Sequence, residues 1–210
     1  MLLGGNPSQW FKTHLPRLAK HYPRIGPAYV ALVTRVVEQL CKRGLEVYHV
    51  PFAVEDADFA AAVFRNMPVR LLPYSSDPLK TLMRVARCSS FIATRFHSNV
   101  FALLAGVPTI SIAYAPKCVH LWEELGLPVR SQIRMVQVVA DPLQAAEQIL
   151  STTPAVLPFD KARAISARAT QHCVEVFDRV QEIMRESNIP RTGSRRGSKP
   201  SRDEGDGHSE

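Results

Sequence analysis

The chain has 210 residues, of which 46% are hydrophobic and 21% are charged, so it has enough apolar material for one large folded domain. Its longest apolar run covers residues 100–114 and is broken by Gly106 and Pro108, so this run is not the roughly 20-residue helix that crosses a membrane. The first residues lack the basic stretch and long apolar core of a signal peptide. We therefore expect a cytoplasmic protein, with the inner face of the membrane as an alternative location.

The net charge of the chain is +7, and where this charge lies bears on the kind of partner that the protein binds. The last twenty residues hold five basic and four acidic side chains, so they carry +1 and the rest of the chain carries +6. This excess suits an anionic small molecule, a phosphorylated lipid or a nucleic acid, and charge alone does not choose among them. The four cysteines are scattered without a Cys-x-x-Cys pair, so neither a zinc site nor a disulfide framework is indicated.

Residues 1–27 are rich in glycine and proline, which predicts a junction or loop segment with room for one short helix. Leu2 and Leu3, just ahead of Gly4, are typical of the last residues of a strand. Because a domain seldom starts at the end of a strand, we expect this segment to be partial.

Residues 28–152 alternate between helix-like and strand-like patterns. Apolar residues at helical spacing predict helices over 28–43, 56–66, 78–87, 98–105 and 119–125, with Asp77 as the cap of the third and Gly126 after the last. β-Rich or continuously apolar runs predict strands over 46–50, 69–72, 90–94 and 109–113. Alternating units of this length predict right-handed βαβ crossovers. The expected fold is α/β and Rossmann-like, with a parallel sheet covered by helices on both faces.

The end of the chain has two different patterns. Residues 158–187 carry apolar side chains at helical spacing and predict one long helix, which we include with residues 28–187 in a single Rossmann-like domain. Residues 188–210 contain too little apolar material to fold, so a disordered polar tail is predicted. A tether to an anionic surface through Arg195 and Arg196 is the alternative for this tail.

Polar side chains follow the predicted strand over residues 90–94. Arg95 leaves this strand, and His97, Ser98 and Asn99 fall in the first turn of the next helix. Ligands of open parallel sheets bind beyond the carboxyl ends of the strands, and a helix N-terminus there offers unpaired N–H groups to an anion. Arg95 adds a fork of donors suited to a carboxylate or phosphate, and His97 adds a group that titrates near neutrality. The stretch therefore predicts an anion site.

A second polar cluster, Tyr114 and Lys117, follows the predicted strand over residues 109–113. If consecutive strands are neighbours, Tyr114 and Lys117 reach the same sheet edge as Arg95 and His97. The arrangement suits a small polyanion that also needs acid–base help. Each residue also has a structural interpretation: Arg95 as the partner of a surface carboxylate, His97 as a helix cap, and Lys117 as surface charge.

Four other polar residues give weaker signals. Asp56 and Asp58 are interpreted as first-turn helix residues rather than metal ligands. His49, on its short β-rich run, is interpreted as a core or edge residue. His120, close to Lys117 in the sequence, is a candidate for a supporting role at the site.

The stretch from Arg95 to Leu127, RFHSNVFALLAGVPTISIAYAPKCVHLWEELGL, resembles the C-terminal half of the polysaccharide pyruvyl transferase family. The features that carry the resemblance are Arg-x-His, an apolar helix, Gly-x-Pro, a β-strand, Tyr-x-x-Lys and a helix that ends near Leu-Gly, in this order. Upstream, RGLEVYHVPFAVEDADFAAAV is similar to a family segment in which a strand ends in Pro-Phe before an aspartate-bearing helix. The resemblance covers residues 28–150.

The resemblance implies a two-lobed, glycosyltransferase-B-like architecture, of which this chain would be the C-terminal lobe. It also implies transfer of pyruvate from phosphoenolpyruvate to a pair of sugar hydroxyls, as a ketal, in surface polysaccharide biosynthesis. The implied partners are phosphoenolpyruvate, a saccharide or lipid-linked saccharide acceptor, and an N-terminal lobe or partner chain. No nucleic acid, metal or further cofactor is expected.

The same resemblance implies roles for the residues of the predicted anion site. His97 is expected to be the catalytic residue that gives a proton to the enol carbon of phosphoenolpyruvate. The residues expected to bind substrate are Arg95, Lys117, Ser98, Asn99 and Tyr114.

Two other functions remain as alternatives at this stage. The first is a glycosyltransferase lobe that binds the diphosphate of a nucleotide sugar with the same cations, although no persuasive carboxylate for the ribose is seen. The second is a non-catalytic subunit of a polysaccharide assembly system, whose positive charge contacts polyprenyl-phosphate membranes or a partner lobe.

Overall fold

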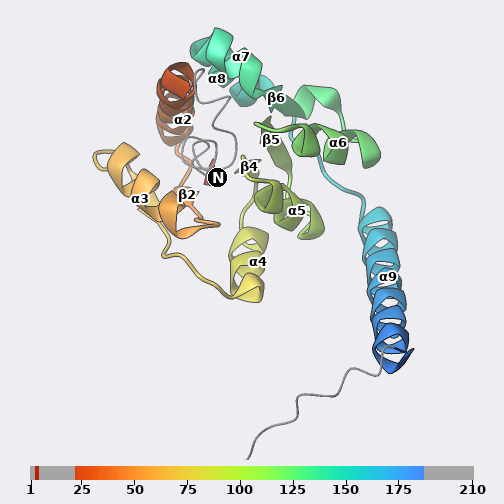
Figure 1. Cartoon of the computed structure of the whole chain (residues 1–210). Coiled ribbons are helices and arrows are strands. Elements are labelled where there is room, and N and C mark those ends of the chain that lie inside the picture. The colour runs from red at the N-terminus through yellow and green to blue at the C-terminus, as the bar shows by residue number, and fades with distance from the viewer. Residues whose placement is uncertain (1–2, 5–21, 187–210) are drawn as a thin grey trace, which may run out of the picture. The chain divides into compact units, whose positions relative to one another are not determined.

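The computed structural model describes residues 3–4 and 22–186, and Figure 1 shows how their helices and strands are arranged. The chain divides into two compact units, residues 1–165 and residues 166–210, and each is described by itself. Most of the predicted junction segment and the whole predicted polar tail lie outside the described residues.

The described strands of the first unit are short, and all of them pair in parallel. They are β1 (Leu3–Gly4), β2 (Val47–His49), β3 (Val69–Leu71), β4 (Phe91–Ala93), β5 (Thr109–Ala113) and β6 (Gln132–Arg134). One sheet has the order β1-β4-β5-β6, and the other contains β2 and β3. Because β1 also contacts β2, the strands follow one another in the order 3-2-1-4-5-6, which is the order of a Rossmann fold.

The helices confirm the predicted alternation. They are α2 (Tyr22–Lys42), α3 (Val54–Val63), α4 (Pro78–Ala86), α5 (Phe96–Leu104), α6 (Pro116–Glu124), α7 (Met135–Ala140), α8 (Pro142–Ser151) and α9 (Phe159–Glu186), with a short 3-10 turn, η2 (Val129–Ser131). Each helix and strand predicted between residues 28 and 126 is present, with ends that differ by a few residues. Asp77 caps α4 as expected, since its Oδ1 accepts from the amides of Leu79 and Lys80 at 2.9 and 3.2 Å.

Helix α2 begins earlier than its apolar pattern predicts. The prediction starts at residue 28, whereas the helix starts at Tyr22 and contains Pro27. A proline in the first turn of a helix removes an N–H that has no partner there, and one slightly further in costs a single hydrogen bond. The buried apolar face of α2, which includes Leu32, Val33 and Val36, offsets this loss.

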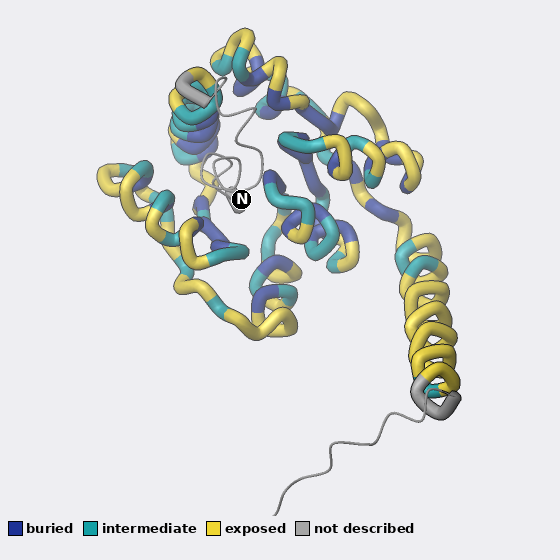
Figure 2. The backbone as a smooth tube through the Cα atoms, in the orientation of Figure 1, coloured by how far each residue is buried: buried dark blue, intermediate teal, exposed yellow. Residues whose placement is uncertain are grey.

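The parallel sheet is covered on both faces, as predicted. Ile92 of β4 packs in the cluster that includes the apolar face of α2. Its neighbours Phe91 and Ala93 point to the other side and pack in a second cluster with Val85 of α4 and Ala102 of α5. Figure 2 shows β4 and β5 as buried segments, with more exposed helices beside them. The α/β, Rossmann-like fold predicted from the sequence is therefore confirmed.

The last helix, α9, confirms the long helix predicted over residues 158–187. Within the first unit, its residues Ala162 and Ile165 pack in a cluster with Trp122 and Leu157. Within the second unit, the helix exposes several large apolar side chains, among them Val176 and Phe177. None of the helices formed by the described residues is long and apolar enough to cross a membrane.

Candidate functional site

The two polar clusters predicted from the sequence lie at one edge of the sheet. β4 and β5 pair side by side in parallel, with Ile92 opposite Ile110. Arg95 follows the carboxyl end of β4, and Tyr114 follows the carboxyl end of β5. The expectation that these two strands are neighbours is confirmed.

Arg95 forms an ion pair with Asp56, the third residue of α3. Its Nη2 donates to Oδ1 at 2.7 Å, and its Nε donates to Oδ1 at 3.0 Å and to Oδ2 at 2.9 Å. Asp56 is fully buried, and its Oδ2 also accepts from the backbone amides of Phe52 and Ala53 at 2.9 and 3.1 Å. The same carboxylate therefore closes the first turn of α3 and holds the arginine that follows β4.

The ion pair sets both the charge and the direction of the Arg95 side chain. Burial lowers the pKa of Arg95, but the hydrogen bonds and the negative charge of Asp56 outweigh this effect and raise the pKa above its usual value. The side chain is 22% exposed, so part of it faces solvent beside a fixed carboxylate. The alternative interpretation of Arg95 named a surface carboxylate as its partner, whereas the partner is buried.

Helix α5 begins at this arginine without a side-chain cap. Arg95 is the N-cap residue, and its side chain bonds Asp56 rather than the first turn of the helix. Backbone N–H groups at an uncapped helix N-terminus are free to bind an anion or water. That this turn binds an anion stays a prediction.

Ser98 and Asn99 are buried, and both donate to the backbone of Arg95. Ser98 Oγ donates to the Arg95 carbonyl oxygen at 2.7 Å, and Asn99 Nδ2 donates to the same oxygen at 2.8 Å. Asn99 Oδ1 is buried without a hydrogen-bond partner among the described residues. These two predicted substrate-binding residues therefore hold the backbone that carries Arg95.

His97 and Lys117 both lie against the ring of Phe96, the first residue of α5. The ring of His97 meets it edge-on, with 5.8 Å between the centroids. Lys117 Nζ lies 5.3 Å from the centroid of Phe96, in cation–π geometry. Both His97 and Lys117 are exposed. The structure thus brings the two residues together at the start of α5.

Tyr114, the residue after β5, is partly buried. Burial and the nearby Cys118 raise the pKa of Tyr114, and the charge of Arg95 and the backbone of Phe96 only partly oppose them. The phenol is therefore protonated near neutral pH and keeps a hydroxyl proton at this edge.

Asp56 lies in the first turn of α3, as its interpretation from the sequence predicted, but its bond to Arg95 was missed, and so was Tyr29. Tyr29 of α2 is buried, and its hydroxyl lies 2.9 Å from Oγ1 of Thr94, the residue just before Arg95. One signal for Asp56 was present in the sequence. Asp56 follows β2, so it lies at the same sheet edge as Arg95. A partly buried arginine needs a carboxylate nearby.

His49, the last residue of β2, is buried as a core residue, which agrees with one of its two interpretations. Its Nδ1 has no hydrogen-bond partner among the described residues. Burial lowers the pKa of His49 to about 4, and the negative charge of Asp56 opposes this effect only in part. The imidazole is therefore neutral at physiological pH.

Acid is expected to destabilise the protein through His49. The pKa in the folded state lies below the ordinary value of 6.5, so the unfolded state takes up the proton first as the pH falls. This contribution to stability is complete above pH 6.5 and is lost between pH 6.5 and pH 4. Linkage predicts a loss of about 2 kcal/mol between pH 7 and pH 5. Urea denaturation of the wild type and of His49→Gln at both pH values measures it, and an equal loss in both proteins would contradict the assignment.

No group of three or more histidine, cysteine, aspartate and glutamate side chains within residues 3–4 and 22–186 is placed to hold a metal ion. The edge instead offers an anchored arginine, an exposed lysine and histidine, and an uncapped helix N-terminus. These groups suit an anion with more than one charged group and a proton donor beside it.

The fold and this edge define a Rossmann-like protein whose candidate site lies at the carboxyl ends of its strands. The sequence model of the polysaccharide pyruvyl transferase family matches residues 3–116, which is more than half of the 210-residue chain. The chain therefore belongs to the polysaccharide pyruvyl transferase family. No curated protein and no solved structure matches the chain.

The matched residues correct one detail of the predicted resemblance. The match begins at residue 3 and lies in the N-terminal part of this chain, whereas residues 28–150 and only the C-terminal half of the family were expected. The pairing of β1 with β4 gives the physical reason, because it makes the opening residues part of the same sheet. Arg95, His97 and Tyr114 lie inside the match, and Lys117 follows its last residue.

Proposed function

We propose that this protein transfers the pyruvyl group of phosphoenolpyruvate to two hydroxyl groups of a saccharide, forming a ketal, in the synthesis of a surface polysaccharide. The acceptor is a free or lipid-linked saccharide, and the reaction takes place in the cytoplasm or at the inner face of the membrane. Membership of the family supports a transferase that acts in polysaccharide biosynthesis. The observation that carries the proposal is the Arg95–Asp56 ion pair at the uncapped start of α5.

The donor in this proposal carries a carboxylate and a phosphate, and the edge has cations for both. Arg95 binds one of the two groups, with its direction fixed by Asp56. Lys117, which lies against Phe96, binds the other. The N-terminus of α5 adds backbone donors that stabilise charge on the departing phosphate.

His97 supplies the proton in this scheme. It protonates the methylene carbon of phosphoenolpyruvate, which makes C2 electrophilic. One sugar hydroxyl then adds to C2, the C–O bond to phosphate breaks, and the second hydroxyl closes the ketal. One of the two hydroxyl protons returns to His97, and the other leaves with the phosphate. The atoms therefore balance. The exposure of His97 supports this role because a proton donor must reach the substrate.

The nucleotide-sugar alternative is less well supported. Rossmann folds that bind dinucleotides use a carboxylate after the second strand for the ribose hydroxyls. Here Asp56 follows β2, but it is fully buried and bonded to Arg95 and to two backbone amides. The carboxylate in this part of the sheet is therefore committed to the arginine.

Millimolar phosphoenolpyruvate is expected to raise the melting temperature by about 2–4 °C, because a ligand of the folded state stabilises it. A nucleoside diphosphate sugar is expected to give no shift. Lys117→Gln should remove most of the shift, whereas Lys80→Gln, an exposed lysine of α4, should keep it. Differential scanning fluorimetry measures the shifts, and phosphate release with a panel of saccharides measures turnover. No shift with phosphoenolpyruvate would overturn the assignment of the donor.

A further inference from the structure

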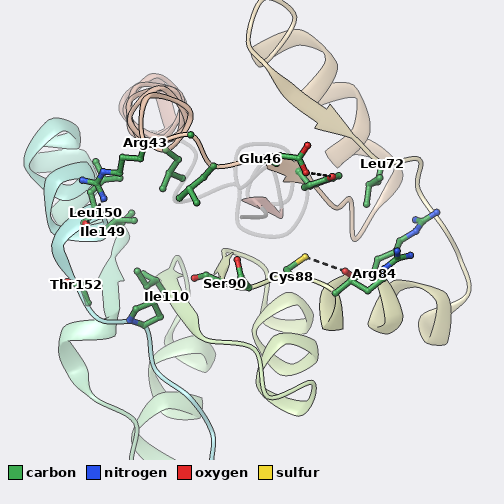
Figure 3. A pocket seen from close by; sticks show the side chains of 17 residues that line it. Arg43, Glu46, Leu72, Arg84, Cys88, Ser90, Ile110, Ile149, Leu150 and Thr152 are labelled. Carbon is green, nitrogen blue, oxygen red and sulfur yellow. Dashed lines mark hydrogen bonds between the residues drawn. The ribbon is translucent and has the colours of Figure 1, made fainter.

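The first unit has a groove at the end of the sheet opposite Arg95. Its volume is about 820 Å³, and its lining includes Glu46 just before β2 and Ser90 just before β4 (Figure 3). Two arginines of the lining already bond to the protein itself, because Nη1 of Arg43 and Nη1 of Arg84 donate to backbone carbonyls at 3.2 and 2.7 Å. We assign no ligand to this groove.

The second unit differs from the first in how its described residues are exposed. These residues, 166–186, all belong to α9, and every residue from 166 to 180 is exposed (Figure 2). Helices in proteins gain most of their stability from packing of an apolar face rather than from the preferences of their residues. The exposed part of α9 is therefore a candidate to pack against a partner.

An apolar stripe runs along this exposed part of α9. It consists of Ala169, Cys173, Val176, Phe177 and Val180. Spacings of four, three and four residues place all of these except Phe177 on one side of the helix, as in the seam of a coiled coil, and Phe177 widens the stripe. Val176, Phe177 and Val180 are 49%, 62% and 45% exposed. The stripe thus has the pattern of a surface that packs against another helix.

Charge is divided unequally between the two halves of this exposed part. Residues 166–174 hold Arg168 and no acidic residue, so they carry +1. Residues 175–183 hold Glu175, Asp178 and Glu182 together with Arg179, so they carry −2. A second α9 that runs in the opposite direction places each basic half against an acidic half, whereas a parallel copy places like halves together. The helix dipoles favour the antiparallel order as well.

One antiparallel register satisfies both the apolar stripe and the charges. It sets Ala169 opposite the partner's Val180, and Cys173 opposite the partner's Val176, so that each layer pairs a smaller side chain with a valine. The same register sets Arg168 opposite residue 181 of the partner, next to the partner's Glu182. This face of α9 is therefore complementary to a second copy of itself.

An anionic membrane surface suits this helix less well. Amphipathic helices that lie on membranes have a polar face rich in lysine and arginine. Residues 166–183 instead carry +1 and −2 in their two halves, which gives a net charge of −1. The charges therefore favour a protein partner with the same division of charge, and a second copy of the chain has it.

We propose that the exposed part of α9 is an interaction surface for a second copy of this chain. The two α9 helices pack antiparallel along their apolar stripes, with Ala169 against the partner's Val180 and Cys173 against the partner's Val176. The proposal is independent of the chemistry at the Arg95 edge.

The first test compares two substitutions of exposed valines on α9. Val180 belongs to the apolar stripe, whereas Val174 is 55% exposed and lies off it. Size-exclusion chromatography with light scattering should give the wild-type chain twice the mass of a monomer at micromolar concentration. Val180→Asp is expected to raise the dissociation constant of the dimer at least about tenfold, because it buries a charge in the seam, and Val174→Asp should keep the wild-type value. A monomeric wild type, or two variants that behave alike, would overturn the proposal.

The second test determines the direction of the helices. A disulfide forms only between residues whose Cα atoms lie within about 7 Å. In the antiparallel register, Val176→Cys brings its new thiol opposite the partner's Cys173, whereas the two copies of Cys173 are three residues out of level. Mild oxidation of Val176→Cys should therefore give at least about fivefold more cross-linked dimer than the wild type, and adding Cys173→Ser should remove this gain. A wild-type chain that cross-links through Cys173 as efficiently as the variant would indicate parallel helices and overturn the proposal.

Discussion

Arg95→Ala is expected to lower the free energy of unfolding by about 3–5 kcal/mol, the largest loss of stability predicted for this protein. The cause is the ion pair with Asp56, whose carboxylate is fully buried. Removal of the guanidinium takes this cation away from the buried carboxylate, which keeps its hydrogen bonds from Phe52 and Ala53. Urea denaturation at pH 7 measures the loss.

A surface ion pair provides the control for this experiment. Arg70 pairs with Glu46 at 2.9 Å, and the two side chains are 66% and 64% exposed. Arg70→Ala is expected to cost less than about 1 kcal/mol, because exposed pairs contribute little. The double variant Arg95→Ala/Asp56→Ala should lose less stability than the sum of its two single variants. Additive losses would show that the ion pair does not account for the effect.

His97→Asn is expected to lower kcat by about 10²–10⁴-fold, as the loss of a general acid does. This prediction rests on the proposed function. The melting temperature should stay unchanged, because His97 is exposed and its ring contacts that of its sequence neighbour Phe96. Release of inorganic phosphate from phosphoenolpyruvate in the presence of an acceptor saccharide measures kcat.

His172→Asn is the matched control for this histidine. His172 is exposed on α9, and its Nδ1 lies 3.9 Å from Oε2 of Glu175. The control should keep kcat, and His97→Asn should keep the thermal shift with phosphoenolpyruvate. Wild-type turnover in His97→Asn would rule out the proton-donor role, and a lost thermal shift would make His97 a binding residue instead.

The place of the site could be predicted because it depends on patterns that a sequence displays. The apolar runs over residues 90–94 and 109–113 indicated covered parallel strands, and these strands are neighbours. Polar residues after two neighbouring strands must meet at one edge. This reasoning placed Arg95 and Tyr114 together without any knowledge of their contacts.

The sequence placed Asp56 after a strand at the same edge as Arg95, but it did not show that the two side chains meet, because this depends on how α3 packs beside the sheet. Asp56 is 39 residues away in the sequence and bonds two amides at the start of α3. An acidic residue in the first turn of a helix is common for that reason alone, so its second role has no separate pattern. The burial of Tyr29 against Thr94 likewise depends on the packing of α2.

The helices and strand between residues 128 and 152 were not predicted from the sequence, for a reason other than the one that applies to Asp56. β6 has three residues, with polar ones at both ends, and therefore lacks an apolar run. Helix α8 did have a start signal, since Asp141 precedes Pro142 as Asp77 precedes Pro78. Asp141 Oδ1 accepts from the amides of the next two residues that have N–H groups, at 3.0 and 2.9 Å.

The carbonyl oxygen of Arg95 accepts from Ser98 Oγ and Asn99 Nδ2, while Asp56 holds the guanidinium of the same residue. Arg95 is thus immobilised at both its main chain and its side chain before any substrate arrives. The conformational entropy of this arginine is already lost when the protein folds. Under the proposed function, it is not lost a second time when the anion binds. Lysine at this position would lack the planar fork that bonds Asp56 through two nitrogens. Under the proposed function, affinity for the anion and stability of the fold therefore depend on the same few contacts.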